Sequence, residues 1–176
     1  KPAETAERLR AILPRAEASG DVTYHAVLLT QLARTESLQR NFDAAHALLD
    51  RVEPMLDEAA PVAAVRTALE RGRTHRSAGD RDAASRLFDE AWTVGQREGL
   101  DALAIDAAHM RALVAEGDAA LEWNRKALAI AEASEDPRAR KWTGSLCNNI
   151  GWTLHADGDY PGAVSYTHLT LPTIVS

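Results

Sequence analysis

The sequence is short of several residue types, and each shortage excludes a class of protein. It has a single cysteine, Cys147, so it can form neither an internal disulfide nor a multi-cysteine metal site. No stretch approaches the roughly 20 consecutive apolar residues that a membrane-spanning helix needs. The formal net charge of −6 argues against a general nucleic-acid-binding protein, because such proteins need a basic face for the phosphates. We expect a cytoplasmic protein that contacts neither membrane nor nucleic acid directly.

Alanine supplies much of the 45% hydrophobic share, whereas only 5% of the residues are aromatic. Alanine is the best helix former and a poor strand residue, so this composition favours packed helices. The 176 residues suffice for a domain with its own core, and 26% charged residues is ordinary for a globular protein. Helical periodicity runs through most of the chain, and no useful strand pattern precedes residue 164. The predicted fold class is all-α.

Short turns divide the periodic sequence at regular intervals. One helix is predicted from Pro2 to Ser19, with Pro14 expected to kink or weaken it. Long helices follow, and the brief turns between them lie at 40–41, 79–80, 117–118 and 158–159, with further breaks at 57–61, 98–99 and 134–137. Most of the brief turns are Gly-Asp, because glycine ends one helix and aspartate caps the next.

The segments between these turns repeat. Ala45, Ala84, Ala120 and Ala163 each follow a brief turn, at intervals of 39, 36 and 43 residues, which is typical of a helical solenoid. The clearest unit contains Arg71-Gly72-x-x-His75, then Gly79-Asp80, then Ala84-x-x-x-Phe88-x-x-Ala91. It resembles the tetratricopeptide repeat, whose pattern is Leu-Gly-x-x-Tyr, a Gly-Asp turn and Ala-x-x-x-Phe-x-x-Ala. The fourth unit matches as well, through Gly151, Gly158-Asp159 and Ala163, and the other two match more loosely.

The resemblance implies an α-α superhelix of antiparallel helix pairs. It covers 21–163, in units of about 21–58, 59–99, 100–135 and 136–163, and 1–20 is expected to be the trailing helix of a preceding repeat. Small residues such as Gly72, Ala84 and Gly151 are expected where helices cross, because close approach requires small side chains. Similar long-helix arrays occur in bacterial regulators and scaffold proteins, and the alanine- and arginine-rich usage also indicates a bacterium.

In such arrays the first helix of each pair lines a concave groove that binds extended peptides or helices. The resemblance therefore implies a protein–protein interaction module or scaffold. Aligning the units places eight residues in or beside this groove: Arg34, Arg66, Arg73, Arg76, Arg111, Asn148, Trp152 and His155. Because arginine recognises carboxylates with two parallel hydrogen bonds, an acidic partner is one expectation. The alternative is a solvated helix face whose arginines pair with neighbouring carboxylates.

No enzyme motif is present, so we expect neither catalysis, nor a cofactor, nor a metal site. The six histidines are scattered without paired metal-ligand spacing, and there is no phosphate-binding glycine loop. Two alternatives to a scaffold stay open. The array could be the sensor or regulatory arm of a bacterial signalling protein or transcription regulator, or it could accompany a catalytic domain outside this sequence.

Both ends of the sequence suggest a truncated fragment. The chain begins at Lys1 without a methionine, and Val164–Thr173 resembles the translation of a sequencing adapter, so 164–176 is expected to be a non-native tail. On that interpretation, the last helix before the tail lacks its neighbour. Apolar surface around Ile150 and Leu154 would then be exposed and would favour self-association.

Overall fold

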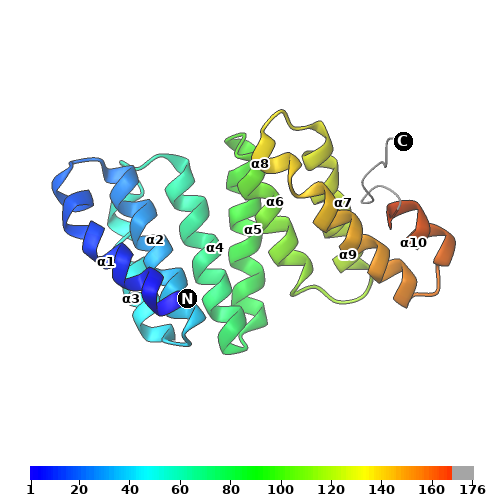
Figure 1. Cartoon of the computed structure of the whole chain (residues 1–176), viewed down its shortest axis with the longest axis horizontal. Coiled ribbons are helices and arrows are strands. Elements are labelled where there is room, and N and C mark those ends of the chain that lie inside the picture. The colour runs from blue at the N-terminus through cyan, green and yellow to red at the C-terminus, as the bar shows by residue number, and fades with distance from the viewer. Residues whose placement is uncertain (168–176) are drawn as a thin grey trace. The chain divides into compact units, whose positions relative to one another are not determined.

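The computed structural model describes residues 1–167, and every regular element within that range is helical (Figure 1). Helices pack against their neighbours in chain order, as in an α-α repeat protein. The predicted all-α fold class is therefore confirmed. Within residues 1–167, none of the helices combines the length and the apolar character that crossing a bilayer requires. The chain divides into two compact units, 1–100 and 101–176, which we describe in turn.

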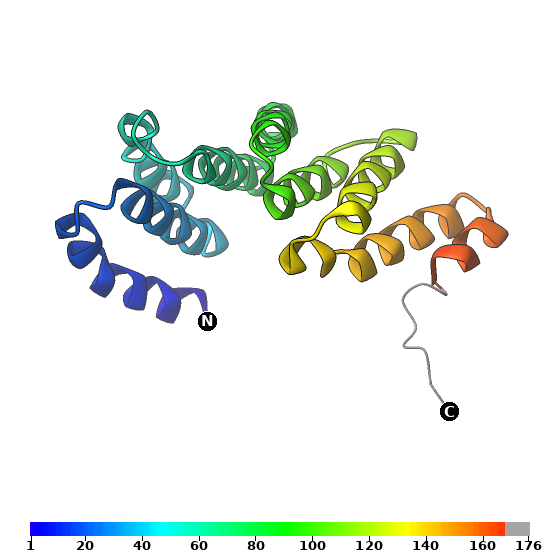
Figure 2. The same cartoon turned by 90° about the horizontal axis from the view of Figure 1, so that it is seen from above.

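Unit 1 consists of five packed α-helices and one short 3₁₀ turn. Its elements are α1 (Pro2–Ala18), α2 (Val22–Leu38), α3 (Phe42–Asp50), the 3₁₀ turn η1 (Glu53–Met55), α4 (Pro61–Ala78) and α5 (Arg81–Arg97). Helix α2 packs against α1, α3 and α4, and α4 packs along α5 (Figure 2). Because short turns join them, the pairs α1–α2, α2–α3 and α4–α5 are antiparallel. As predicted, the first helix is continuous, and it runs through Pro14.

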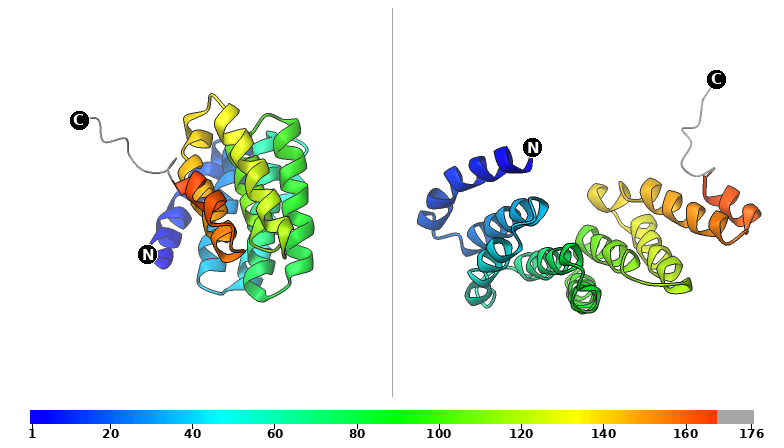
Figure 3. Two further views of the ribbon diagram at one scale, coloured as in Figure 1. Left: turned by 90° about the vertical axis from the view of Figure 1, so that its right-hand side faces the viewer. Right: turned by 90° about the horizontal axis from the view of Figure 1, so that it is seen from below.

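Unit 2 contains two helix pairs and, between them in the sequence, one single-turn helix. Its elements are α6 (Asp101–Ala112), α7 (Asp118–Ala133), α8 (Pro137–Arg140), α9 (Thr143–Ala156) and α10 (Tyr160–Thr167). The pairs are α6–α7 and α9–α10, and α7 packs against α9 as well (Figure 3). Short α8 lies against α6 and α7.

The turn chemistry explains where the helices begin and end. Gly79 is the C-cap of α4, and its backbone lies in the left-handed region at φ 97°. A glycine adopts this conformation without steric strain because it has no Cβ atom. The next residue, Asp80, then accepts a hydrogen bond from the Ala83 amide at 3.0 Å and caps α5. Asp21 caps α2 in the same way, through the Tyr24 amide at 2.8 Å.

One helix of unit 1 is shorter than the sequence pattern predicted. Helix α3 ends at Asp50, although periodicity suggested a long helix up to the break at 57–61. The cause is Pro54, whose ring would collide with the carbonyl of residue 50 and which has no amide hydrogen to donate. The chain therefore continues as η1, with Pro54 in its first turn.

The expectation of an unpaired last helix is wrong. Helix α10 packs on α9, and its last four residues belong to the segment that resembles an adapter. Ile150 is fully buried and Leu154 is only 7% exposed, because α9 packs against both α7 and α10. The predicted exposed surface around these two residues is therefore absent. Residues 168–176, the rest of the suspected tail, lie outside the described part of the chain.

Small residues lie at the helix crossings, as expected. Ala33, Ala45 and Ala84 are fully buried. One close approach is in the α4–α5 pair, where a Cβ added at Gly72 would lie 2.5 Å from Cε1 of Phe88. Phe88 is itself fully buried, so its ring has no open space into which it could withdraw.

Replacing Gly72 with alanine should therefore destabilise unit 1. The added methyl group overlaps the Phe88 ring, and overpacking of this kind costs about 1–3 kcal/mol of unfolding free energy. Urea unfolding followed by circular dichroism measures the change. Gly144→Ala is the matched control, because nothing lies within 4 Å of its added Cβ in α9. The unfolding free energy of the control should rise by about 0.5–1 kcal/mol, because alanine favours the helix more than glycine does. Equal changes in the unfolding free energy of the two variants would refute the close approach at Gly72.

Candidate functional site

The eight residues predicted to line a groove divide evenly between the two units. Arg34 lies on α2, and Arg66, Arg73 and Arg76 lie on α4, so these four belong to unit 1. Arg111 lies on α6, and Asn148, Trp152 and His155 lie on α9, so these four belong to unit 2. They lie on α2, α4, α6 and α9, the helices that the repeat alignment took as the first of each pair.

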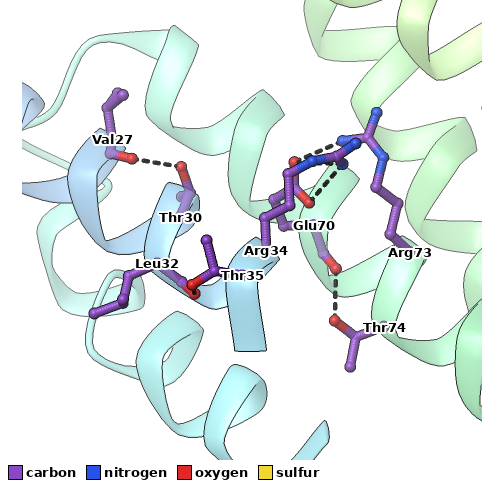
Figure 4. A network of polar contacts seen from close by, with 8 residues as sticks. All are labelled: Val27, Thr30, Leu32, Arg34, Thr35, Glu70, Arg73 and Thr74. Atoms are coloured by element: carbon purple, nitrogen blue, oxygen red, sulfur yellow. Dashed lines mark hydrogen bonds and ion pairs between the residues drawn. The ribbon is translucent and has the colours of Figure 1, made fainter. Parts of the chain in front are cut away.

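A buried carboxylate brings two of the arginines together in unit 1 (Figure 4). The side chain of Glu70 is only 5% exposed and lies between α2 and α4. Arg34 donates from Nη1 to its Oε2 at 3.2 Å, and Arg73 donates from Nη1 to its Oε1 at 2.6 Å. Arg34 and Arg73 therefore have a carboxylate partner within the protein. This is the pairing expected if the arginines lie on a solvated helix face and contact neighbouring carboxylates.

Burial makes this pairing important for the fold. A carboxylate removed from water is stable only when charged donors replace the lost hydration. Arg34 comes from the neighbouring helix, so its bond to Glu70 links α2 to α4, whereas Arg73 lies one turn along the same helix. The buried hydroxyl of Thr74 donates to the Glu70 carbonyl at 2.9 Å, which satisfies a further polar group there.

The other two arginines of unit 1 differ in exposure. Arg66 lies one turn before Glu70 on α4, and its Nε is buried without a hydrogen-bond partner among the described residues. Arg76 is exposed and lies in the last turn of α4. Arg34 keeps 41% of its side chain exposed despite its bond to Glu70. Arg34 and Arg76 can therefore contact a ligand from solvent without unfolding unit 1.

In unit 2, Arg111 stacks on a tryptophan of the paired helix. Its guanidinium carbon lies 5.6 Å from the ring centroid of Trp123, and the Lys126 ammonium lies 4.4 Å from the same centroid. Both geometries fall within the range of cation–π attraction. The half-buried Trp123 thus contacts cations of α6 and of its own helix.

Helix α9 carries a different kind of surface. Trp152 is 66% exposed, and its ring lies 5.9 Å from that of His155, which in turn lies 5.2 Å from the ring of Tyr160 in α10. These rings border a largely apolar hollow of about 260 Å³. Gly151, Ala163 and Val164 complete its walls. Asn148 is exposed one turn before Trp152.

Sequence reasoning missed two parts of these sites. It overlooked Glu70, although a glutamate four residues after Arg66 and three before Arg73 lies on the same helix face as both. It also missed Tyr160 and Val164 as neighbours of Trp152, and Val164 was set aside because the chain after Ala163 resembles foreign sequence. The signal for Glu70 was helical spacing, applied to the carboxylates as well as to the arginines.

The structure shows the surroundings of the single cysteine and the distribution of the side chains that commonly bind metal ions. Cys147 is fully buried, and burial raises the pKa of its thiol, with the Glu132 carboxylate adding to the effect, so it is a poor nucleophile. Among residues 1–167, no group of three or more His, Cys, Asp or Glu side chains is placed to hold a metal ion.

Two histidines of unit 1 are in contact, and the pKa of one of them, His46, is shifted. The rings of His46 on α3 and His75 on α4 lie 4.9 Å apart, and His75 Nδ1 lies 3.4 Å from a carboxylate oxygen of Asp80. Burial lowers the pKa of His46 below its usual value of 6.5, and the positive charges of His75 and Arg71 lower it further. The carboxylates of Asp50 and Asp43 oppose this shift without reversing it.

No family model matches the chain, and no curated protein is significantly similar to it in sequence. The fold and the geometry of these surfaces therefore carry the argument on function.

The His46 contact predicts that unit 1 loses stability as the pH falls. The folded state holds the His46 pKa down and so binds fewer protons than the unfolded state, which titrates near 6.5. Above pH 6.5, His46 should not reduce the free energy of unfolding. That free energy should decline as the pH falls through 6.5, because the unfolded state then takes up a proton that the folded state resists. The depressed pKa of Asp80 acts in the same direction, but only near and below its usual 3.8.

Urea unfolding at pH 7.5 and at pH 5.5 measures this decline. His46→Gln should show a smaller decline than the parent protein, because it removes the group whose pKa differs between the two states. All other ionisable groups are common to both proteins, so the difference between their declines belongs to His46. Equal declines in the two proteins would contradict the assignment.

Proposed function

We propose that the chain is a protein–protein interaction module that binds a peptide or helical segment of a partner through the first helices of its pairs. The observation that carries this proposal is the surface of α9. There, a tryptophan that is two-thirds exposed borders an apolar hollow, and two further aromatic rings flank it. Tryptophan and tyrosine are enriched among the residues that dominate binding energy in protein interfaces. The resemblance to tetratricopeptide repeats, which bind segments on this helix, supports the same function.

The chemistry around the hollow indicates what the partner presents. Its walls are apolar, so an aliphatic or aromatic side chain fits as the anchor. Asp157 and Asp159, in the turn that joins α9 to α10, are exposed and form no ion pair within the described chain. A basic residue beside the anchor could therefore pair with the carboxylate of Asp157, whereas that of Asp159 already accepts a hydrogen bond from the Gly162 amide at 3.0 Å. We propose a segment with an apolar anchor and an adjacent lysine or arginine as the ligand of this surface.

The acidic partner expected from the arginines is a separate proposal for unit 1. It is supported by Arg34 and Arg76, which are accessible on neighbouring helices. It cannot be tested by reversing the charge of Arg34 or Arg73, because a second carboxylate against Glu70 would destabilise α2 and α4. Arg76→Glu avoids this difficulty, since Arg76 lies outside the Glu70 contact.

A peptide selection tests the proposal and does not require the partner to be identified first. Random peptides displayed on phage would be selected on the immobilised chain, and the enriched peptides would be measured in solution by fluorescence anisotropy. We expect the enriched peptides to share an apolar anchor with a neighbouring basic residue. Trp152→Ala should weaken their binding at least about tenfold, as truncation of a central aromatic anchor does.

Leu38→Ala is the matched control, because Leu38 is a large apolar residue that is 60% exposed and belongs to α2 of unit 1 rather than to α9. The control should bind the selected peptides like the parent protein. Peptides whose affinity is unchanged by Trp152→Ala, or reduced equally by both variants, would contradict a site on α9. Enrichment of acidic peptides sensitive to Arg76→Glu would instead assign the binding to unit 1.

A further inference from the structure

Three aromatic rings line one hollow in unit 2. Trp152 and His155 belong to the C-terminal half of α9, and Tyr160 is the first residue of α10. The planes of Trp152 and His155 meet at 67°, and those of His155 and Tyr160 meet at 72°. Because neighbouring rings are inclined this steeply and all three line the hollow of about 260 Å³, they can contact a group there from more than one side.

The walls of the hollow offer few hydrogen-bond acceptors. Among the described residues that line it, only the His155 imidazole and the Tyr160 hydroxyl are side-chain acceptors, and none carries a carboxylate or an amide side chain. A lysine ammonium has three N–H donors and a guanidinium has five, and burying donors without acceptors costs free energy. An unmodified basic head group is therefore a poor occupant of the hollow itself.

The surroundings of the hollow nevertheless favour a positive charge. The faces of aromatic rings attract cations within about 6 Å, and neither lysine nor arginine is among the described residues that line the hollow. Asp157 is exposed in the turn between His155 and Tyr160, and it forms no ion pair within residues 1–167. A neutral apolar occupant would gain nothing from either source of attraction.

We infer that the hollow binds the trimethylammonium group of a methylated lysine in a protein partner. This group keeps the positive charge that the rings attract, its surface is apolar, and it has no N–H donor to satisfy. The four-carbon stem of the lysine can pack on Ala163 and Val164, and Trp152 is 66% exposed, so the peptide chain has access to the site. The inference rests on the function proposed for α9 and narrows it, because one side chain supplies both the apolar anchor and the charge.

Titration with a short glycine peptide that contains one central trimethyllysine tests this inference. Binding to the full chain would be followed at pH 8, where histidine is ordinarily neutral, by two-dimensional NMR, and the backbone amides of 151–164 should shift in a saturable manner. The decisive comparison is a peptide whose quaternary nitrogen is replaced by carbon, since it keeps the shape and loses the charge. It should bind about 2- to 30-fold more weakly, because it lacks the cation–π attraction.

The outcomes separate this inference from the function on which it rests. Equal binding by the two peptides would overturn the inference and leave the proposed function intact, because the hollow would then hold any apolar anchor. A trimethyllysine peptide that causes no saturable shift would also overturn it, whereas peptides selected on phage carry unmodified side chains and test the proposed function separately. The unmodified lysine peptide should bind more weakly than the trimethyllysine peptide, and equal or tighter binding would overturn the inference.

Trp152→Leu tests the ring apart from its apolar bulk. Leucine keeps an apolar wall and lacks an aromatic face, so the preference for trimethyllysine over the neutral peptide should fall at least about twofold. Tyr24→Leu is the matched control, because it removes an exposed aromatic ring from α2 of unit 1. The control should keep the preference of the parent protein, and an unchanged preference in Trp152→Leu would exclude the ring as the group that recognises the charge.

Asp157→Asn tests the contribution of the carboxylate. The trimethyllysine peptide should bind about 1.5- to 5-fold more weakly, as expected for the loss of one exposed charge pair. Asp57→Asn removes the same charge from an exposed position of unit 1 and should leave the affinity unchanged. An equal loss in both variants would show a general effect of net charge and would exclude Asp157 from the site.

Free choline distinguishes a protein partner from a small molecule as the source of the group. Choline carries the same trimethylammonium without a lysine stem or a peptide chain, so it should bind more weakly than the trimethyllysine peptide. Equal or tighter binding by choline would assign the hollow to a small molecule and would overturn the choice of a methylated lysine.

Discussion

The Glu70 carboxylate is the constraint on which the arginine side of unit 1 depends. It is buried, and it is shared by an arginine of its own helix and one of the neighbouring helix. Loss of either guanidinium would leave this buried carboxylate with one charged donor instead of two, in a medium that solvates it poorly. The pair therefore fixes the contact of α2 with α4 and sets the direction in which Arg34 points. A ligand can contact only the arginine surface that the Glu70 contact leaves exposed. The acidic-partner proposal therefore rests on the exposed part of Arg34 and on Arg76, which lies outside that contact.

Much of the fold could be predicted from turns and periodicity, because these are local properties. Gly79 and Asp80 end one helix and begin the next through their own backbone preferences, and Gly72 marks a helix crossing through its lack of a side chain. Prediction failed where one residue overrode the periodic pattern, as Pro54 does at the end of α3. It failed again at α10, which extends through the first four residues of the segment that resembles an adapter and packs on α9.

The candidate sites were less predictable, because they depend on which side chains meet across helices. Aligning the repeats put Arg34 and Arg73 on first helices, but the aligned positions carry no information on the carboxylate between them. The same alignment selected Trp152, and only the packing of α10 reveals the hollow beside it.

A double-mutant cycle between Arg34 and Glu70 tests the central constraint most directly. The free energy of unfolding would be measured for the parent protein, Arg34→Leu, Glu70→Gln and the double variant. Two side chains joined by a partly buried ion pair should show a coupling energy of about 0.5–3 kcal/mol, with the double variant less destabilised than the sum of the single ones. Single effects that add to within about 0.5 kcal/mol would contradict the account.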